Sequence, residues 1–123
     1  MAKLTFVGGI HPYDGKDLSK DKPIQDVLPK GEMVYPLSQH IGAPAKPIVA
    51  KGDRVLAGQK IAESGGFVSA PIYASVSGTV KTIETRRVVT GDLIQSIVID
   101  NDGLYESEEF HPYAPVDKLQ KEE

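Results

Sequence analysis

The chain has 123 residues, of which 14 are basic and 17 acidic, and its formal net charge is −3. This near-neutral balance gives no electrostatic basis for binding nucleic acid. The chain contains no cysteine, which excludes disulfides, cysteine nucleophiles and thiolate-bound iron–sulfur clusters on it. No stretch approaches the ~20 consecutive apolar residues of a membrane-spanning helix, so we expect no direct membrane insertion.

Turn-forming residues dominate the chain, with twelve glycines and nine prolines. No window keeps a helical period, and the candidate strands are short, which favours a small all-β barrel or sandwich. We expect an N-terminal arm packed on the domain over residues 1–31, a core over residues 32–104, and an acidic exit segment or linker over residues 105–123. The chain then forms a single domain, and we expect it to be a fragment of a longer subunit.

In chain order, the arm comes first, and we expect it to be anchored by Ile24, Val27 and Leu28. A strand is predicted over residues 33–37, ending near Pro36. The following loop contains Pro44 and Pro47, each of which fixes φ and lacks a backbone donor, so regular strand pairing is not expected there.

The remaining predicted strands are separated by glycine-containing turns. They cover residues 48–50, 54–56, 59–62, 67–73, 79–84, 88–90 and 95–100. In the strand that starts at Thr79, Val80 and Ile83 are the expected inward residues. The predicted turns lie at Gly52-Asp53, Gly65-Gly66, Gly91-Asp92 and Asn101-Asp102-Gly103.

One motif stands out, Gly-Asp-Arg-Val-Leu-Ala-Gly-Gln-Lys-Ile at residues 52–61, followed by Ser-Gly-Thr-Val at residues 77–80. Gly52 permits a positive φ in the turn, and Asp53 is expected to accept hydrogen bonds from backbone donors there. Nothing in the motif is chemically reactive, so its role is structural. The pattern is typical of biotinyl/lipoyl-type domains and of their relatives, the barrel-sandwich hybrids.

Biotinyl and lipoyl domains carry their cofactor on a lysine at a hairpin tip, about a dozen residues before the Gly-Thr-Val-type turn. That position falls here at Gly66-Phe67, and no lysine lies between Ile61 and Val80. We therefore expect no cofactor on this chain. Phe67 is expected to cap the barrel or to contact a partner domain.

His11 and His40 both lie in loops rich in glycine and proline, where functional side chains often occur. The favoured interpretation is that they hydrogen-bond the loop backbone and hold the loops against a neighbouring domain. A metal site needs more ligands at suitable spacing. A phosphohistidine carrier is the other alternative, because some phosphotransferase proteins share the hybrid barrel.

Two further motifs are more specific: Gly-Gly-Ile-His-Pro at residues 8–12 and Pro-Leu-Ser-Gln-His-Ile-Gly-Ala-Pro at residues 36–44. With the glycine turns, they resemble the N-terminal domain of the RnfC family over residues 8–103. The resemblance implies a peripheral subunit on the cytoplasmic side of the cell membrane. Its complex passes electrons between ferredoxin and NAD, coupled to sodium or proton translocation.

The resemblance also implies that a flavin- and NADH-binding domain and a ferredoxin-like domain follow. FMN and [4Fe-4S] clusters are therefore expected on that missing part of the parent subunit. The alternatives are the equivalent domain of the sodium-pumping NADH–quinone reductase A subunit or of a cobalamin-reductase homologue. A biotin or lipoyl carrier and a phosphohistidine carrier belong to different classes.

We therefore expect an all-β barrel-sandwich hybrid with extended N- and C-terminal arms, acting as a non-catalytic docking domain. Its expected partners are the flavin/NADH-binding domain of the same subunit and other Rnf subunits at the membrane. The candidate interface residues are Gly8, Gly9, His11, Pro12, Gln39, His40, Gly42, Pro44 and Phe67.

Overall fold

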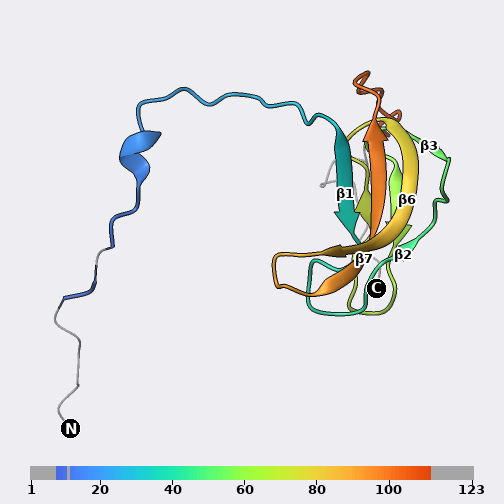
Figure 1. Cartoon of the computed structure of the whole chain (residues 1–123), viewed down its shortest axis with the longest axis horizontal. Helices are drawn as coiled ribbons and strands as arrows, with labels where there is room; N and C mark the ends of the chain where they lie inside the picture. The colour runs from blue at the N-terminus through green and yellow to red at the C-terminus, as the bar shows by residue number, and fades with distance from the viewer. Residues whose placement is uncertain (1–7, 11, 112–123) are drawn as a thin grey trace, which may run out of the picture.

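The computed structural model describes residues 8–10 and 12–111. Apart from one turn of 3-10 helix, the described elements are β-strands, as predicted (Figure 1). In chain order they are η1 (Lys16–Leu18), β1 (Glu32–Pro36), β2 (Lys46–Pro47), β3 (Arg54–Val55), β4 (Lys60–Glu63), β5 (Ile72–Tyr73), β6 (Gly78–Arg87) and β7 (Leu93–Asn101).

The strands form two sheets, and all paired neighbours are antiparallel. The larger sheet has the order β1-β7-β6-β3, and the smaller has the order β2-β4-β5. Residues from both sheets form one hydrophobic core, in which the largest fully buried apolar side chains are Val55, Ile61, Val76, Val80, Ile97 and Ile99. The predicted all-β class is therefore confirmed.

A register shift in β6 explains why its inward residues are three positions apart. Val80 lies opposite Ile99, and Ile83 lies opposite Ile97, because the ladder skips one residue between Val80 and Thr82. Such a bulge adds one unpaired residue to a strand. Val80 is buried and Ile83 packs against the core, as predicted. The strand predicted over residues 88–90 is wrong, because β6 continues to Arg87 and residues 88–90 lie in the turn before β7. Of the strand predicted over residues 67–73, only Ile72–Tyr73 forms.

The Gly52-Asp53 turn has the predicted chemistry. Gly52 has φ 93°, a conformation that glycine adopts without steric cost. The Asp53 carboxylate accepts a hydrogen bond from the Ala50 backbone N–H at 2.7 Å. The motif thus fixes the connection into β3.

The strand predicted over residues 48–50 is wrong. The strand at this point is β2, which lies earlier, at Lys46–Pro47, and pairs with β4. The Ile48 N–H donates to the Ile61 carbonyl at 3.0 Å, and Pro47 lies opposite Ala62. Because hydrogen-bonded pairs alternate along an antiparallel ladder, Pro47 occupies a position where no N–H is needed. Pairing across this proline is therefore possible.

The N-terminal arm extends away from the barrel up to its junction with β1 (Figure 1). The expected anchoring residues do not pack on the domain: Ile24 is 100% exposed, and Val27 and Leu28 are also exposed. The arm is held instead at Pro29, whose carbonyl accepts hydrogen bonds from Tyr105 Oη and Asn101 Nδ2. The expected anchoring through the three apolar residues is therefore wrong for this structure.

Candidate functional site

Two loops meet at one end of the barrel, the loop between β1 and β2 and the loop between β4 and β5. The Ala43 N–H donates to the Val68 carbonyl at 2.9 Å, joining the two loops. A Cβ atom at Gly65 would lie 1.9 Å from the Pro44 carbonyl oxygen. Glycine is therefore required at Gly65 for the loops to approach this closely.

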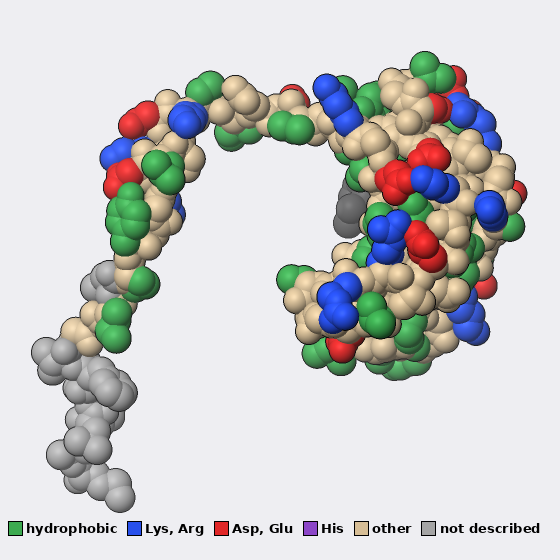
Figure 2. Space-filling view, in the orientation of Figure 1, with side chains coloured by type: hydrophobic (Ala, Val, Ile, Leu, Met, Phe, Trp, Pro, Cys, Tyr) green, Lys and Arg blue, Asp and Glu red, His purple; other side chains and the backbone are tan. Residues whose placement is uncertain are grey.

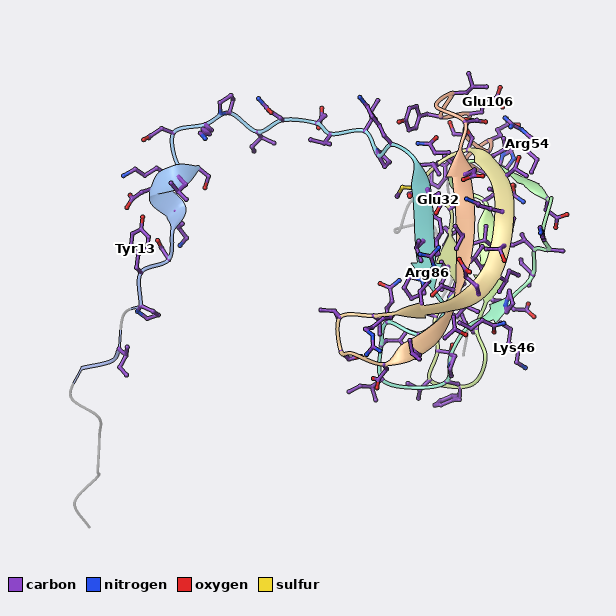
Figure 3. All side chains as sticks on the ribbon, viewed as in Figure 1. Tyr13, Glu32, Lys46, Arg54, Arg86 and Glu106 are labelled. Carbon is purple, nitrogen blue, oxygen red and sulfur yellow. The ribbon has the colours of Figure 1, made fainter. Side chains whose placement is uncertain are left out.

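This contact brings together most of the candidate interface residues. They are exposed and belong to the same pair of loops: Gln39, His40, Gly42, Pro44 and Phe67. Gly8, Gly9 and Pro12 belong instead to the arm, which also carries Tyr13 and lies far from this end of the barrel (Figure 3). His11 lies outside the described residues.

His40 makes a weak local contact. Its Nδ1 lies 3.3 Å from the carbonyl oxygen of the next residue, Ile41, and the neighbouring Gln39 Nε2 donates to the Pro36 carbonyl at 3.4 Å. The histidine thus contacts loop backbone, as interpreted from the sequence. Across the described ranges, no group of three or more His, Cys, Asp or Glu side chains is arranged to hold a metal ion.

Exposed apolar side chains surround these loops, and only Phe67 among them is a residue that the sequence predicts at an interface. Phe67 is 104% exposed, Ile41 is 96% exposed, and Val68 is 59% exposed. Figure 2 shows hydrophobic side chains gathered around this lower end of the barrel. We call Ile41, Phe67 and Val68 the apolar tip. The sequence offers no signal for Ile41 and Val68, because their exposure depends on how the two loops meet.

A groove of about 680 Å³ lies beside the apolar tip, between β1 and the β6–β7 hairpin. Its apolar lining comes from Val34, Pro36, Ile41, Val88, Val89 and Ile94. Arg86 and Arg87 also line it. Arg86 is paired with Glu84 at 2.6 Å and lies 3.9 Å from Glu32 (Figure 3). The lining also includes Asp92, whose carboxylate accepts a hydrogen bond from the Thr90 hydroxyl at 2.8 Å. The groove therefore combines an apolar floor with two basic groups and one acidic group.

The opposite end of the barrel carries a polar network instead. Arg54 bonds the carboxylates of Asp102 at 2.8 Å and Glu106 at 2.5 Å, as Figure 3 shows for the labelled Arg54 and Glu106. The Ser77 hydroxyl donates to Asp102 at 2.8 Å and accepts from the Glu106 backbone N–H at 2.9 Å. These bonds fasten the segment after β7 to the barrel.

The expected start of the exit segment at residue 105 therefore does not match the contacts. Tyr105 packs against the hydrophobic core. The Ala57 N–H donates to the Glu106 carbonyl, and the Glu108 N–H donates to the Ala57 carbonyl. The domain continues at least to Glu108. The remainder of the predicted C-terminal arm lies outside the described residues from position 112 onward.

The network also predicts a pH dependence of folding. Hydrogen bonds from the Leu104 backbone N–H and from Ser77, together with Arg54, lower the pKa of Asp102 below its usual 3.8. A depressed carboxyl pKa stabilises the fold above the unfolded pKa, and this stabilisation is lost as the pH falls through the folded pKa. We expect Asp102→Asn to flatten the acid limb of the stability profile, measured by urea unfolding between about pH 5 and pH 2. Parallel profiles for the two proteins would contradict this.

The loop between β4 and β5, where a biotinyl or lipoyl domain would present its lysine, carries Gly65, Gly66 and Phe67. In the described part of the chain the only helical element is the three-residue η1, so no helix there could cross a bilayer.

Comparison with known proteins decides the family. A family model described as the RnfC barrel sandwich hybrid domain matches residues 4–104. The chain belongs to this family. The barrel-sandwich hybrid fold expected from the glycine turns is thereby confirmed, as is the resemblance carried by the motifs at residues 8–12 and 36–44.

Relatives of this RnfC domain bear names that describe a multi-subunit complex. Over 100 residues the chain is 47% identical to the C subunit of the Na⁺-translocating ferredoxin:NAD⁺ oxidoreductase complex of Acetobacterium woodii, covering 81% of this chain and 23% of that protein. Over 99 residues it is 46% identical to the C subunit of the proton-translocating ferredoxin:NAD⁺ oxidoreductase complex of Clostridium ljungdahlii, covering 80% and 22%.

A more distant relative matches more of the chain. The C subunit of the ion-translocating oxidoreductase complex of Vibrio cholerae is 37% identical over 119 residues, which cover 95% of this chain and 15% of that protein. The RnfC domain therefore spans less than a quarter of the length of these three relatives. The comparisons support the RnfC interpretation over the reductase and carrier alternatives.

Proposed function

We propose that this chain is the N-terminal docking domain of an RnfC protein, a peripheral member of an Rnf complex, and that it is non-catalytic by itself. The family match over residues 4–104 supports the RnfC assignment. Two relatives are named as ferredoxin:NAD⁺ oxidoreductase subunits, one sodium-translocating and one proton-translocating. In this proposal the chain is a scaffold in a complex that couples electron transfer between ferredoxin and NAD⁺ to ion translocation.

The single observation that carries the docking role is the apolar tip. Its three large side chains are exposed in loops that are held together by backbone contacts. Because the loops need little reordering, a partner that covers them gains apolar burial at a low entropic cost. Aromatic residues are enriched in protein interfaces, and Phe67 is the fully exposed aromatic residue of the tip.

The partner proposed for the tip is the flavin/NADH-binding domain of the same subunit. FMN and [4Fe-4S] clusters are proposed for the rest of that subunit; the clusters need cysteine thiolates, which this chain does not contain. Other Rnf subunits at the membrane are proposed as further partners. The position is peripheral, on the cytoplasmic side of the cell membrane.

The test is a calorimetric titration of this chain with the remainder of its parent subunit, supplied separately with FMN bound. We expect saturable binding, and we expect Phe67→Ser and Ile41→Ser each to raise the Kd about tenfold or more, equivalent to about 1.4 kcal/mol. The matched control is Leu104→Ser, which alters an exposed leucine after β7. Its Kd should match that of the unaltered chain.

The remaining candidate residues can be tested in the same titration. Replacing His11 with alanine tests whether the N-terminal arm contributes to the interface, and replacing His40 with alanine tests whether the loop between β1 and β2 does. An absence of binding, or equal weakening by Leu104→Ser, would contradict docking through the apolar tip. The membrane subunits would then be the partners to titrate.

A further inference from the structure

Strand β1 has a free edge. It is the first strand in the order β1-β7-β6-β3. The Leu37 N–H donates to the Gln95 carbonyl, and the Asn101 N–H donates to the Gly31 carbonyl. Because bonding residues alternate in an antiparallel pair, Glu32 and Val34 direct their backbone N–H and C=O groups away from β7. No described strand pairs with this edge, and such an edge is a template for another strand.

The groove described above borders the same edge. Val34 and Pro36 of β1 form part of its wall, and the β6–β7 hairpin supplies Val88 and Val89. Arg87 also lines the groove; its guanidinium donates to the Gly91 carbonyl at 2.7 Å. Within residues 8–10 and 12–111, Arg87 makes no ion pair with a carboxylate. A segment that fits this surface is therefore extended, apolar and acidic at one point.

The arm contains such a segment next to β1. Residues 24–28 read Ile-Gln-Asp-Val-Leu and lie between Pro23 and Pro29. Ile24 is fully exposed and Leu28 is mostly exposed. Asp26 makes no ion pair in the described part of the chain. Its charge is complementary to that of Arg87, and the apolar side chains match the floor of the groove.

The link between this segment and β1 has the sequence of a hairpin turn. Leu28-Pro29-Lys30-Gly31 places proline at the second position of a four-residue turn and glycine at the fourth, as type I turns favour. Three-residue hairpin loops combine a type I turn with a following left-handed residue. Gly31 already has φ 77°. The junction is thus suited to returning the arm along β1.

We propose that residues 24–28 pair antiparallel with β1 of the same chain and extend the larger sheet by one strand. The turn sets the register: Leu28 lies opposite Glu32, Asp26 opposite Val34, and Ile24 opposite Pro36. At these positions the backbone N–H and C=O groups of β1 point outward. Pro36 has no N–H, so only its carbonyl takes part, as a hydrogen-bond acceptor. Ile24 and Leu28 then cover the groove, and Asp26 faces the arginines. The structure has the arm in its extended position (Figure 1).

The first test uses the absence of native cysteine, which makes an engineered pair unambiguous. In the proposed register Val27 and Met33 form a non-hydrogen-bonded pair with Cα atoms about 4.5 Å apart, within the range that a disulfide spans. We expect Val27→Cys with Met33→Cys to oxidise to an intramolecular disulfide in dilute solution. Intact mass should fall by two hydrogen atoms, and gel filtration should give a monomer.

The matched control is Asp26→Cys with Met33→Cys, whose side chains would lie on opposite faces of the extended sheet. We expect it to oxidise at least about tenfold more slowly. Equal rates for the two pairs would mean that the arm has no fixed register, and slow oxidation of both would mean that it does not pair with β1. Either result overturns the proposal. A disulfide between two molecules also overturns it, because the strand would then come from a second copy.

Amide exchange gives an independent test on the unmodified backbone. The Val34 N–H should be protected in the natural chain, and Asp26→Pro should speed its exchange about tenfold or more, because proline disrupts strand pairing. Amides of Ile97 and Ile99 in the core should exchange unchanged, since residue 26 lies outside the barrel. The same Val34 exchange rate in both proteins would overturn the proposal. These measurements use this chain alone, so their outcome is independent of partner docking.

Discussion

Gly78→Ala is expected to destabilise the domain by about 3 kcal/mol, the upper range for overpacking a filled interior. Gly78 is buried in β6, opposite Val55 on one side and Asn101 on the other. A Cβ atom there would lie 1.9 Å from the Asp100 carbonyl oxygen and 2.9 Å from its carbonyl carbon. The obstruction is backbone of the neighbouring strand, so β7 would have to move. Urea unfolding followed by circular dichroism measures the change.

Gly66→Ala is the matched comparison. Its Cβ would approach the Ala43 methyl group at 3.1 Å and nothing else within 4 Å. A small local shift can relieve that contact, so the change in unfolding free energy should be clearly smaller. If the two variants unfold at the same urea concentration, the close approach of β6 and β7 is not what requires glycine at position 78.

Ile97→Ala is expected to destabilise the domain by about 2–5 kcal/mol, as removal of a buried aliphatic side chain does elsewhere. Ile97 has no exposed surface and lies on β7 between Tyr35 of β1 and Ile83 of β6. Its loss would leave a cavity where three strands meet. Domains of this size are stabilised by only about 5–15 kcal/mol in total, so the thermal midpoint should fall by many degrees.

The control for Ile97→Ala is Leu93→Ala, on the same strand near the hairpin tip. Leu93 is mostly exposed, so its truncation removes little buried area and should shift the unfolding midpoint only slightly. A comparable loss for both variants would contradict the assignment of Ile97 to the central core.

Local chemistry makes much of the fold predictable from the sequence. Gly52 and Asp53 indicate a turn because glycine readily adopts a positive φ, and the short aspartate side chain accepts hydrogen bonds from nearby backbone N–H groups. The β-branched run Ile97-Val98-Ile99 marks a strand, and all three of its side chains are buried. These signals depend on residues close together in the chain, so they are informative without knowledge of the sheet order.

Two of the wrong predictions involve contacts between distant segments. The missing N–H of Pro47 argues against pairing, but it falls at a position of the β4 ladder where none is needed. The acidic character of residues 105–108 predicts an exit segment, yet Arg54 and Ser77 hold these residues on the barrel. The residues that face Pro47 and those that hold residues 105–108 cannot be identified from the sequence until the arrangement of the strands is known.

The candidate site is predictable in part. The sequence indicates Gln39 to Pro44 and Phe67 separately, and the structure joins their loops through Ala43 and Val68. Ile41 and Val68 do not stand out, because an exposed apolar residue cannot be distinguished from a buried one in a strand-rich sequence. The groove cannot be predicted from the sequence either, because its walls come from β1 and from the β6–β7 hairpin, which lie far apart in the chain.

The pairing of β1 with β7 has a consequence for how the chain acquires its structure during synthesis. Glu32 pairs with Asp100 and Pro36 with Ser96, so β1 leaves the ribosome long before its neighbour exists. Until then Met33 and Tyr35 have no core to pack against, and closing so long a loop is entropically costly. Domains with such non-local pairing fold slowly. The barrel should therefore form only after β7 has emerged, nearly at the end of this stretch of polypeptide.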